Sequence, residues 1–121
     1  MEQTKKTIVQ KLKLIKNDSF LLAEKYYAIL SAINDLKLTQ REIQLIAFTA
    51  ISGNMSYKYI REDFCKKYDT TSATINNIIS KLKKMGVLVK NGSKIKVNPV
   101  ILLNFSNDDV ILEVKLFHGE A

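Results

Sequence analysis

Residues 69–97, DTTSATINNIISKLKKMGVLVKNGSKIKV, contain the pattern that decides the fold of this chain. The first half predicts a helix over about residues 72–85, because apolar side chains recur there at every third or fourth position. These side chains are Ile75, Ile78, Ile79, Leu82 and Met85. Any of the polar residues 69–72 can cap the first turn, and Gly86 stands where a helix C-terminus favours a left-handed residue. The opposite face of this helix is small and polar at its start and cationic at its end.

A β-hairpin is predicted directly after this helix. Two short runs, 87–90 and 93–97, flank Asn91-Gly92, a dipeptide that favours a two-residue turn because both of its positions tolerate a positive φ. Pro99 ends the second run, since proline has no N–H to donate to a strand ladder. We therefore expect a helix, a glycine break and a short hairpin, in that order.

Two further helices are predicted ahead of this stretch. Thr39 and Glu42 have the spacing of a capping box, in which each side chain bonds the backbone N–H of the other residue, and an apolar stripe runs from there to a break at residues 52–54. Ser56 is placed to cap the next helix. The inward residues of that helix are expected to be Ile60, Phe64, Cys65 and Tyr68, and its outward residues Lys58, Arg61, Glu62, Lys66 and Lys67. The three-residue turn 69–71 then gives the spacing of a helix-turn-helix.

Residues 74–89, TINNIISKLKKMGVLV, resemble the recognition helix and first wing strand of MarR-type winged-helix regulators, which follow the pattern Thr-Val-x-x-Leu-Val-x-x-Leu-x-x-x-Gly-Leu-Val. The likeness extends over about residues 39–97. It implies a winged helix-turn-helix, which is a mainly α fold of the α+β class with a small β-hairpin wing. Asn77 stands where those regulators often carry Arg, and the wing carries Lys rather than Arg. Residues 38–46, LTQREIQLI, are also similar to the opening of LuxR-type domains, but those domains lack a wing.

The chain of 121 residues is long enough for one core and is expected to form a single domain. The winged helix-turn-helix core would cover residues 39–97, between an N-terminal extension and helix at 1–38 and a C-terminal extension at 98–121. The N-terminal helix is predicted over residues 19–36. Its apolar stripe consists of Leu22, Tyr26, Ile29, Leu30 and Ile33, and this stripe fits packing within the chain as well as pairing with a second subunit.

The segments outside these helices have apolar patterns of their own. Residues 11–14 alternate with the period of a strand, although residues 8–15 would suit a helix equally. Residues 110–117, VILEVKLF, also alternate, so strand-like extensions are predicted at both termini. Residues 100–105 are apolar enough to be buried against the helices.

The charge of the chain favours a polyanionic partner, since the net charge is +7 and the sequence pI about 9.5. Composition offers another explanation, because Ile, Lys and Asn make up 40 of the 121 residues, a bias that an AT-rich genome would produce by itself. The stretch from Lys81 to Lys96 is more specific. It contains six lysines and neither Asp nor Glu, and it coincides with the helix end and the hairpin that would face DNA.

Enzymatic chemistry is not expected. The single histidine, His118, has no carboxylate or Cys spaced for a triad or a metal site, Cys65 has no His close in sequence, and the four glycines form no phosphate-binding loop. No catalytic residue, metal ligand or cofactor is therefore predicted. No apolar run approaches the roughly 20 residues of a membrane span, no signal peptide is visible, and the lone cysteine favours a reducing compartment. A cytoplasmic protein with no membrane contact is expected.

Double-stranded DNA is the expected partner, and transcriptional regulation is the simplest role. The helix over about residues 72–85 would enter the major groove, with Asn76 and Asn77 at base edges and Ala73 against a thymine methyl, while the Lys-rich wing over about 87–97 would follow the backbone. The residues expected at phosphates are Thr71, Ser72, Ser80, Lys81 and Lys84 on the helix and Lys90, Lys94 and Lys96 on the wing. A palindromic target would require a homodimer, formed through the N-terminal helix or the terminal strands.

A protein-interaction module is the alternative. Winged helices also pack on protein inside larger assemblies, and Asn98-Pro99 just after the wing is similar to the winged domains of small plasmid replication initiators. A short Lys- and Asn-rich chain fits a phage or mobile element, as a structural or replication accessory protein. DNA binding predicts that Asn77 and Lys84 are free and share a surface with the wing lysines. A protein-interaction role predicts that a partner covers this surface or an exposed strand edge.

Overall fold

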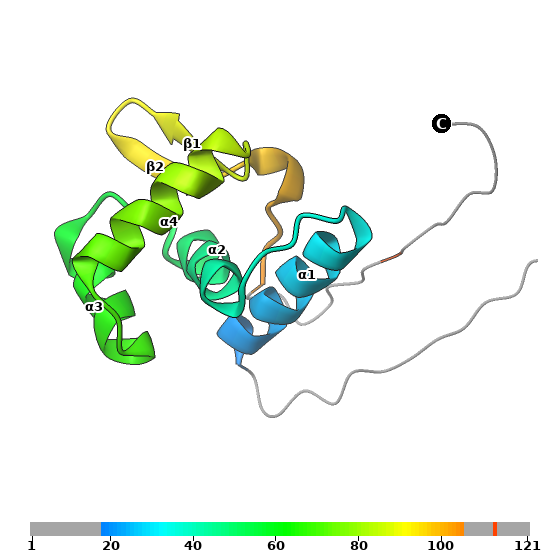
Figure 1. Cartoon of the computed structure of the whole chain (residues 1–121), viewed down its shortest axis with the longest axis horizontal. Coiled ribbons are helices and arrows are strands. Elements are labelled where there is room, and N and C mark those ends of the chain that lie inside the picture. The colour runs from blue at the N-terminus through cyan, green and yellow to red at the C-terminus, as the bar shows by residue number, and fades with distance from the viewer. Residues whose placement is uncertain (1–17, 106–112, 114–121) are drawn as a thin grey trace, which may run out of the picture.

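The computed structural model describes residues 18–105 and 113. Within them, four helices are followed by one antiparallel hairpin and a short 3-10 turn (Figure 1). The elements are α1 (Ser19–Ile33), α2 (Gln40–Ser52), α3 (Lys58–Tyr68), α4 (Ser72–Lys84), β1 (Leu88–Asn91), β2 (Lys94–Val97) and η1 (Pro99–Ile101). This mainly helical fold with a small hairpin confirms the predicted fold class. The predicted strand-like extensions, 11–14 and 110–117, lie outside the described residues apart from residue 113.

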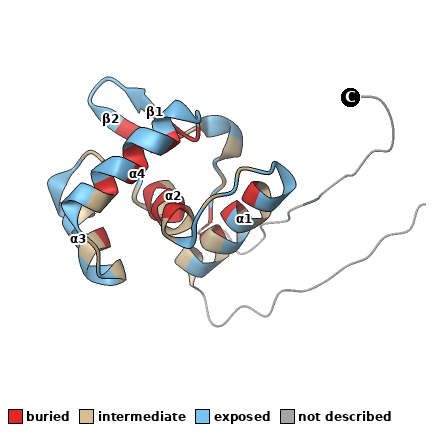
Figure 2. Ribbon diagram, viewed as in Figure 1, coloured by how far each residue is buried: buried red, intermediate tan, exposed pale blue. Residues whose placement is uncertain are grey.

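The helices and the hairpin share one apolar core. Figure 2 shows buried residues on the facing sides of α1, α2 and α4 and on the inner side of the hairpin. The largest fully buried side chains include Tyr27 from α1, Leu45 and Ile46 from α2, Phe64 from α3, Ile75 and Leu82 from α4, and Leu88 from β1. Because α1 and Phe105 belong to the same cluster of buried residues as the other elements, the N-terminal helix is an integral part of the core.

Local capping chemistry sets the ends of α2 and α4 where the sequence predicts them. Thr39 Oγ1 accepts a hydrogen bond from the Glu42 N–H, and Glu42 Oε1 accepts one from the Thr39 N–H at 2.8 Å, which confirms the capping box. Thr71 caps α4 by accepting from a backbone N–H of its first turn. Gly53 and Gly86 follow the two helices with φ of +88° and +78°, a left-handed conformation that glycine adopts without strain.

α1 is shorter than predicted, and its most deeply buried residues lie beside the predicted stripe. It ends at Ile33, short of the predicted end, and the Ile33 side chain is 48% exposed. The buried positions of α1 are Ala23, Tyr27 and Ser31. Tyr27 Oη donates to the Ile101 carbonyl at 2.9 Å, and Ser31 Oγ accepts from the Leu38 N–H at 3.1 Å. Leu22, Tyr26 and Leu30 of the predicted stripe are half-buried against the same core, so the prediction is confirmed for these three residues, and the inward face also includes the next position of each turn.

α1 packs against α2 of the same chain (Figure 1). The rings of Phe20 and Phe48 stack with their centroids 5.4 Å apart. Farther along the helix, the rings of Tyr26 and Tyr27 lie 5.6 Å and 5.7 Å from the ring of Phe105. Packing within the chain, one of the two arrangements that the sequence allows for this helix, is therefore present, and pairing with a second subunit stays a prediction.

The hairpin is displaced by one residue from the prediction. Leu88 pairs with Val97, and the two residues that join the strands are Gly92 and Ser93 rather than Asn91 and Gly92. Of these two, only Gly92 has a positive φ, +63°, which is the pattern of a type II′ turn. Both registers place Leu88, Ile95 and Val97 on the same, buried side of the hairpin, so the difference lies in the turn itself, where Gly92 occupies the first position that a type II′ turn requires of glycine.

The loop before α3 is held by an asparagine and not by the predicted Ser56 cap. α3 begins at Lys58 and has no side-chain cap. The buried Asn54 side chain accepts from the Ser56 N–H and from the Ile95 N–H of β2, both at 2.9 Å. The Met55 N–H donates to the Ile95 carbonyl at 2.9 Å. The loop therefore forms hydrogen bonds with both the N–H and the carbonyl of Ile95 at the outer edge of β2, as a neighbouring strand would do.

The segment after β2 is only partly buried, so the prediction for residues 100–105 is wrong for two of its apolar side chains. Val100 is 88% exposed and Leu102 43% exposed, whereas Phe105 is buried. Asn98 Oδ1 accepts from the Val100 N–H at 3.1 Å and so starts the turn η1. Because this turn lies across the surface, it directs Val100 to solvent.

Candidate nucleic-acid interface

α4 turns one continuous polar face to solvent. Its apolar residues Ile75, Ile78, Ile79 and Leu82 are buried in the core. All the predicted DNA-contacting residues on this helix and its cap are exposed: Thr71, Ser72, Ala73, Asn76, Asn77, Ser80, Lys81 and Lys84. Met85, which the sequence places in the apolar stripe, follows the last helical residue and is 38% exposed instead. At 100° per residue, Ala73, Asn77 and Lys84 lie directly opposite the core.

The two asparagines of this face are held differently. The side chain of Asn77, like that of Lys84, forms no hydrogen bond or ion pair with another residue in the described part of the chain. Asn76 accepts a hydrogen bond at its Oδ1 from Arg61 Nη1 at 2.6 Å, and Arg61 Nε donates to the Met55 carbonyl at 2.9 Å. Arg61, which was predicted to point outward, is half-buried and connects α4 with the loop before α3.

Lys81 is tied to α2. Its Nζ lies 2.7 Å from Oε2 of Glu42, whose side chain is almost fully buried. Burial by itself raises the pKa of the Glu42 carboxyl, but hydrogen bonds from Lys81 and from Thr39, together with the charge of Lys81, outweigh it and hold the pKa below its ordinary value. The predicted phosphate contact of Lys81 therefore competes with a contact that packs α4 on α2.

The three hairpin lysines do not share one side of the sheet. Lys94 and Lys96 alternate along β2 with the buried Ile95 and Val97, so they point away from the core. Lys90 lies directly opposite Ile95 in the ladder, and cross-strand partners project to the same side. All three lysines are exposed. Lys94 and Lys96 therefore form a pair, while Lys90 lies on the other side, near the turn.

A chain of hydrogen bonds links the hairpin to α4. The Ile95 carbonyl accepts from the Met55 N–H, the Met55 carbonyl accepts from Arg61, and Arg61 donates onward to Asn76. This link was not predicted from the sequence. One signal could have found it, because only two of the 19 basic residues are Arg, and Arg offers a fork of donors that Lys lacks. The other, Arg41, also makes a structural contact, donating to a carbonyl at the end of α3.

Two exposed tyrosines, which were not predicted as site residues either, lie at the start of α3. Tyr57 is 49% and Tyr59 60% exposed, and their rings stack with centroids 5.6 Å apart and an interplanar angle of 18°. Lys58 between them lies 3.8 Å from Glu62 on the helix surface. Tyrosine hydroxyls can contact phosphates. The run Tyr-Lys-Tyr at a helix start is the sequence signal for this pair.

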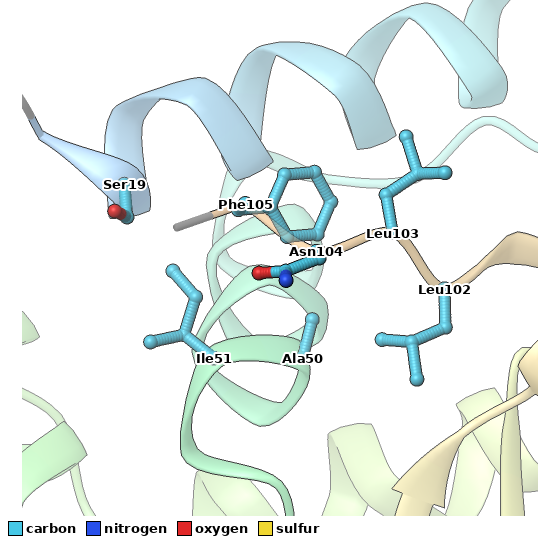
Figure 3. Close-up of a pocket in the computed structure, with 7 residues that line it drawn as sticks. All are labelled: Ser19, Ala50, Ile51, Leu102, Leu103, Asn104 and Phe105. Atoms are coloured by element: carbon cyan, nitrogen blue, oxygen red, sulfur yellow. The ribbon is translucent and has the colours of Figure 1, made fainter. Parts of the chain in front are cut away.

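A hollow of about 400 Å³ lies between the start of α1, the end of α2 and residues 102–105 (Figure 3). It is lined by Ser19, Ala50, Ile51, Leu102, Leu103, Asn104 and Phe105. None of these described side chains is titratable. Among the described residues, no group of His, Cys, Asp and Glu side chains could hold a metal ion. None of the helices described has the length and apolar character that crossing a bilayer requires.

Comparison with known proteins gives no relative from which a function can be transferred. No protein-family model matches the chain, no curated protein matches it, and no solved structure matches it. Function is therefore inferred from the exposed face of α4 and the hairpin that follows it.

Proposed function

We propose that this chain is a winged helix-turn-helix protein that binds double-stranded DNA, with α4 in the major groove and the β1–β2 hairpin along the adjoining backbone. A transcriptional regulator is the simplest role for such a protein. The order of helix, three-residue turn, helix and hairpin supports the proposal. The observation that carries it is the acid-free stretch of sequence from Lys81 to Lys96, in which all six lysines are exposed.

The individual side chains suit this arrangement. Asn77 has both ends of its amide free in the described structure, so it can donate to N7 and accept from N6 of an adenine. Ala73, one turn earlier, is small enough to meet a thymine methyl. Lys84, at the end of the helix, and the outward pair Lys94 and Lys96 are available for phosphates. The remaining predicted phosphate contacts are Thr71, Ser72, Ser80, Lys81 and Lys90.

We expect the affinity for a random duplex to fall steeply with salt, because lysines that neutralise phosphates release counterions. On B-DNA, log K falls against log salt with a slope of about −0.9 per neutralised phosphate. Lys84→Ala and Lys94→Ala should each reduce the magnitude of this slope by about 1, and the double variant by about 2. Fluorescence anisotropy of a labelled duplex, titrated at several salt concentrations, measures these slopes.

Lys25→Ala is the matched control. Lys25 is an exposed lysine on α1, which lies beside α2 and away from the hairpin (Figure 1), so its removal changes the net charge by the same amount. The slope should stay within error of the unsubstituted protein. Failure of the protein to bind any duplex at about 50 mM salt, where non-specific electrostatic affinity is strong, would rule the proposal out.

A protein-interaction module is the second candidate, and the exposed apolar residues after the hairpin favour it. Val100 is 88% and Leu102 43% exposed, and exposed apolar surface can mark a partner site. If a second copy of this chain is the partner, sedimentation velocity should show a dimer that forms with rising concentration. Val100→Asp should then abolish the dimer. A protein that stays monomeric over the same concentration range would exclude self-association through this segment.

A further inference from the structure

The Asn76 amide can face Arg61 only with its oxygen. A guanidinium carries donors and no acceptor, so the contact of 2.6 Å between Arg61 Nη1 and Asn76 requires Oδ1 at that position. The Nδ2 group is then the end that is left for other partners. Asn76 is exposed on the polar face of α4, so its two N–H groups are available at the surface proposed to meet DNA.

The Arg61 guanidinium is itself fixed from a second direction. Its Nε donates to the Met55 carbonyl at 2.9 Å, and the Met55 N–H donates to the Ile95 carbonyl of β2 at 2.9 Å. The buried Asn54 side chain bonds the Ile95 N–H as well. The position of the guanidinium is thus determined by the loop and the hairpin, and the orientation of the Asn76 amide follows from it.

We infer that Arg61 is a positioning residue that makes Asn76 a donor-only contact, and that Asn76 therefore selects guanine over adenine at one base pair. This inference rests on the proposed function. A free asparagine pairs with adenine by donating to N7 and accepting from N6. Asn76 has its oxygen occupied by a cation, which repels a further donor such as the adenine amino group. Guanine presents two acceptors, N7 and O6, and no donor on that edge.

Asn77 provides an internal comparison one residue away. Its amide has no partner in the described part of the chain, so it keeps both a donor and an acceptor for adenine. Adjacent asparagines on one helix are therefore assigned different bases, and the difference depends on a single arginine from α3. The two positions can be separated experimentally.

The experiment is selection of a preferred site from a randomised duplex pool with the full chain, followed by anisotropy on single-base-pair variants of that site. The unsubstituted protein should bind the site with guanine at one base pair about fivefold more tightly than the same site with adenine there, which is the low end for a good base contact. Asn76→Ala should remove the preference at that pair only. Arg61→Met should shift the preference at the same pair toward adenine, because the freed Asn76 amide can then use both its donor and its acceptor. Asn77→Ala should affect a different pair.

Two outcomes separate a positioning role from a structural one. If Arg61→Met weakens binding to every sequence equally and leaves the guanine preference intact, Arg61 only supports the fold and the inference is wrong. If Arg61→Met fails to fold, Asn76→Asp decides, since its carboxylate keeps the bond to Arg61 but has no N–H donor. That variant should lose the preference for guanine and favour cytosine, whose amino group donates a hydrogen bond. A retained preference for guanine would overturn the inference.

The proposed function and this inference can fail separately. Absence of binding to every duplex at low salt would overturn both. Salt-dependent binding with no base preference at the pair governed by Asn76 would overturn the inference alone and leave the proposed DNA binding in place.

Discussion

Phe64→Ala is expected to lower the free energy of unfolding by about 3–5 kcal/mol, the range for truncating a buried aromatic side chain. Phe64 is fully buried. Its ring lies 5.4 Å from Phe48 of α2 in an edge-to-face arrangement and 4.7 Å from Tyr68 at the end of α3. Truncation leaves a cavity where α3 meets α2, and it removes a large share of the roughly 5–15 kcal/mol that stabilises a domain of this size. Urea denaturation followed by circular dichroism measures the change.

Tyr59→Ala is the control on the same helix. Tyr59 is 60% exposed and contacts mainly the ring of Tyr57, so its removal should change the free energy of unfolding by no more than about 0.5 kcal/mol. If Phe64→Ala proves too unstable to purify, Phe64→Leu keeps most of the volume and should still cost about 1–2 kcal/mol. Equal effects of the Phe64 and Tyr59 truncations would mean that α3 does not pack on α2 through Phe64.

Glu42→Gln is expected to lower the free energy of unfolding by about 2 kcal/mol at pH 7. Gln can still complete the capping box with Thr39, so the substitution removes mainly the charge that pairs with Lys81 at 2.7 Å. Breaking a fully buried pair costs about 3–5 kcal/mol, and a smaller value is expected because the Lys81 side chain is half exposed and its charge remains solvated. Chemical denaturation of both proteins at pH 7 gives this difference.

The difference should shrink in acid. The pKa of Glu42 is lowered in the folded protein from an ordinary value of 4.5, so the folded state binds a proton at this site less readily than the unfolded state. The stabilisation is therefore fully present above about pH 4.5 and is lost as pH falls through the lowered folded pKa. Comparing the protein with its own variant cancels the contributions of all the other carboxylates, including Glu24, whose pKa burial raises.

Glu62→Gln is the matched control for this charge. Glu62 lies 3.8 Å from Lys58 on the surface of α3, with both side chains mostly exposed. Such surface pairs contribute about 0–1 kcal/mol, so this variant should stay close to the unsubstituted protein at pH 7 and at pH 3. A Glu42→Gln effect that is the same at both pH values would show that the Lys81 contact does not stabilise the fold.

The sequence predicted which residues of α4 are exposed at the candidate interface, but it did not predict which of them bond residues of other helices. Helical spacing places Asn77 and Lys84 opposite the buried face of α4, and both are exposed and unpaired within the described residues. The same spacing gives no indication that Asn76 bonds Arg61 or that Lys81 bonds Glu42. Those partners come from other helices, and a periodic pattern within one helix carries no information about what its neighbours present.

By itself, the sequence determined the features that depend on neighbours within a few residues. The capping box at Thr39 and Glu42, the three-residue turn before α4 and the left-handed Gly86 all follow from local hydrogen bonding and backbone sterics. The mainly helical class with a hairpin follows from hydrophobic period, which is also a local property.

Only the tertiary structure decided the features that depend on which surfaces meet. α1 buries Tyr27, whose hydroxyl donates to a carbonyl 74 positions away, and the loop before α3 bonds both backbone groups of Ile95 at the outer edge of β2. Arg61 extends along the surface to the loop and to α4, which offer it two acceptors. In each case polar groups pair across elements that are distant in sequence, and the spacing within one element does not encode such partners.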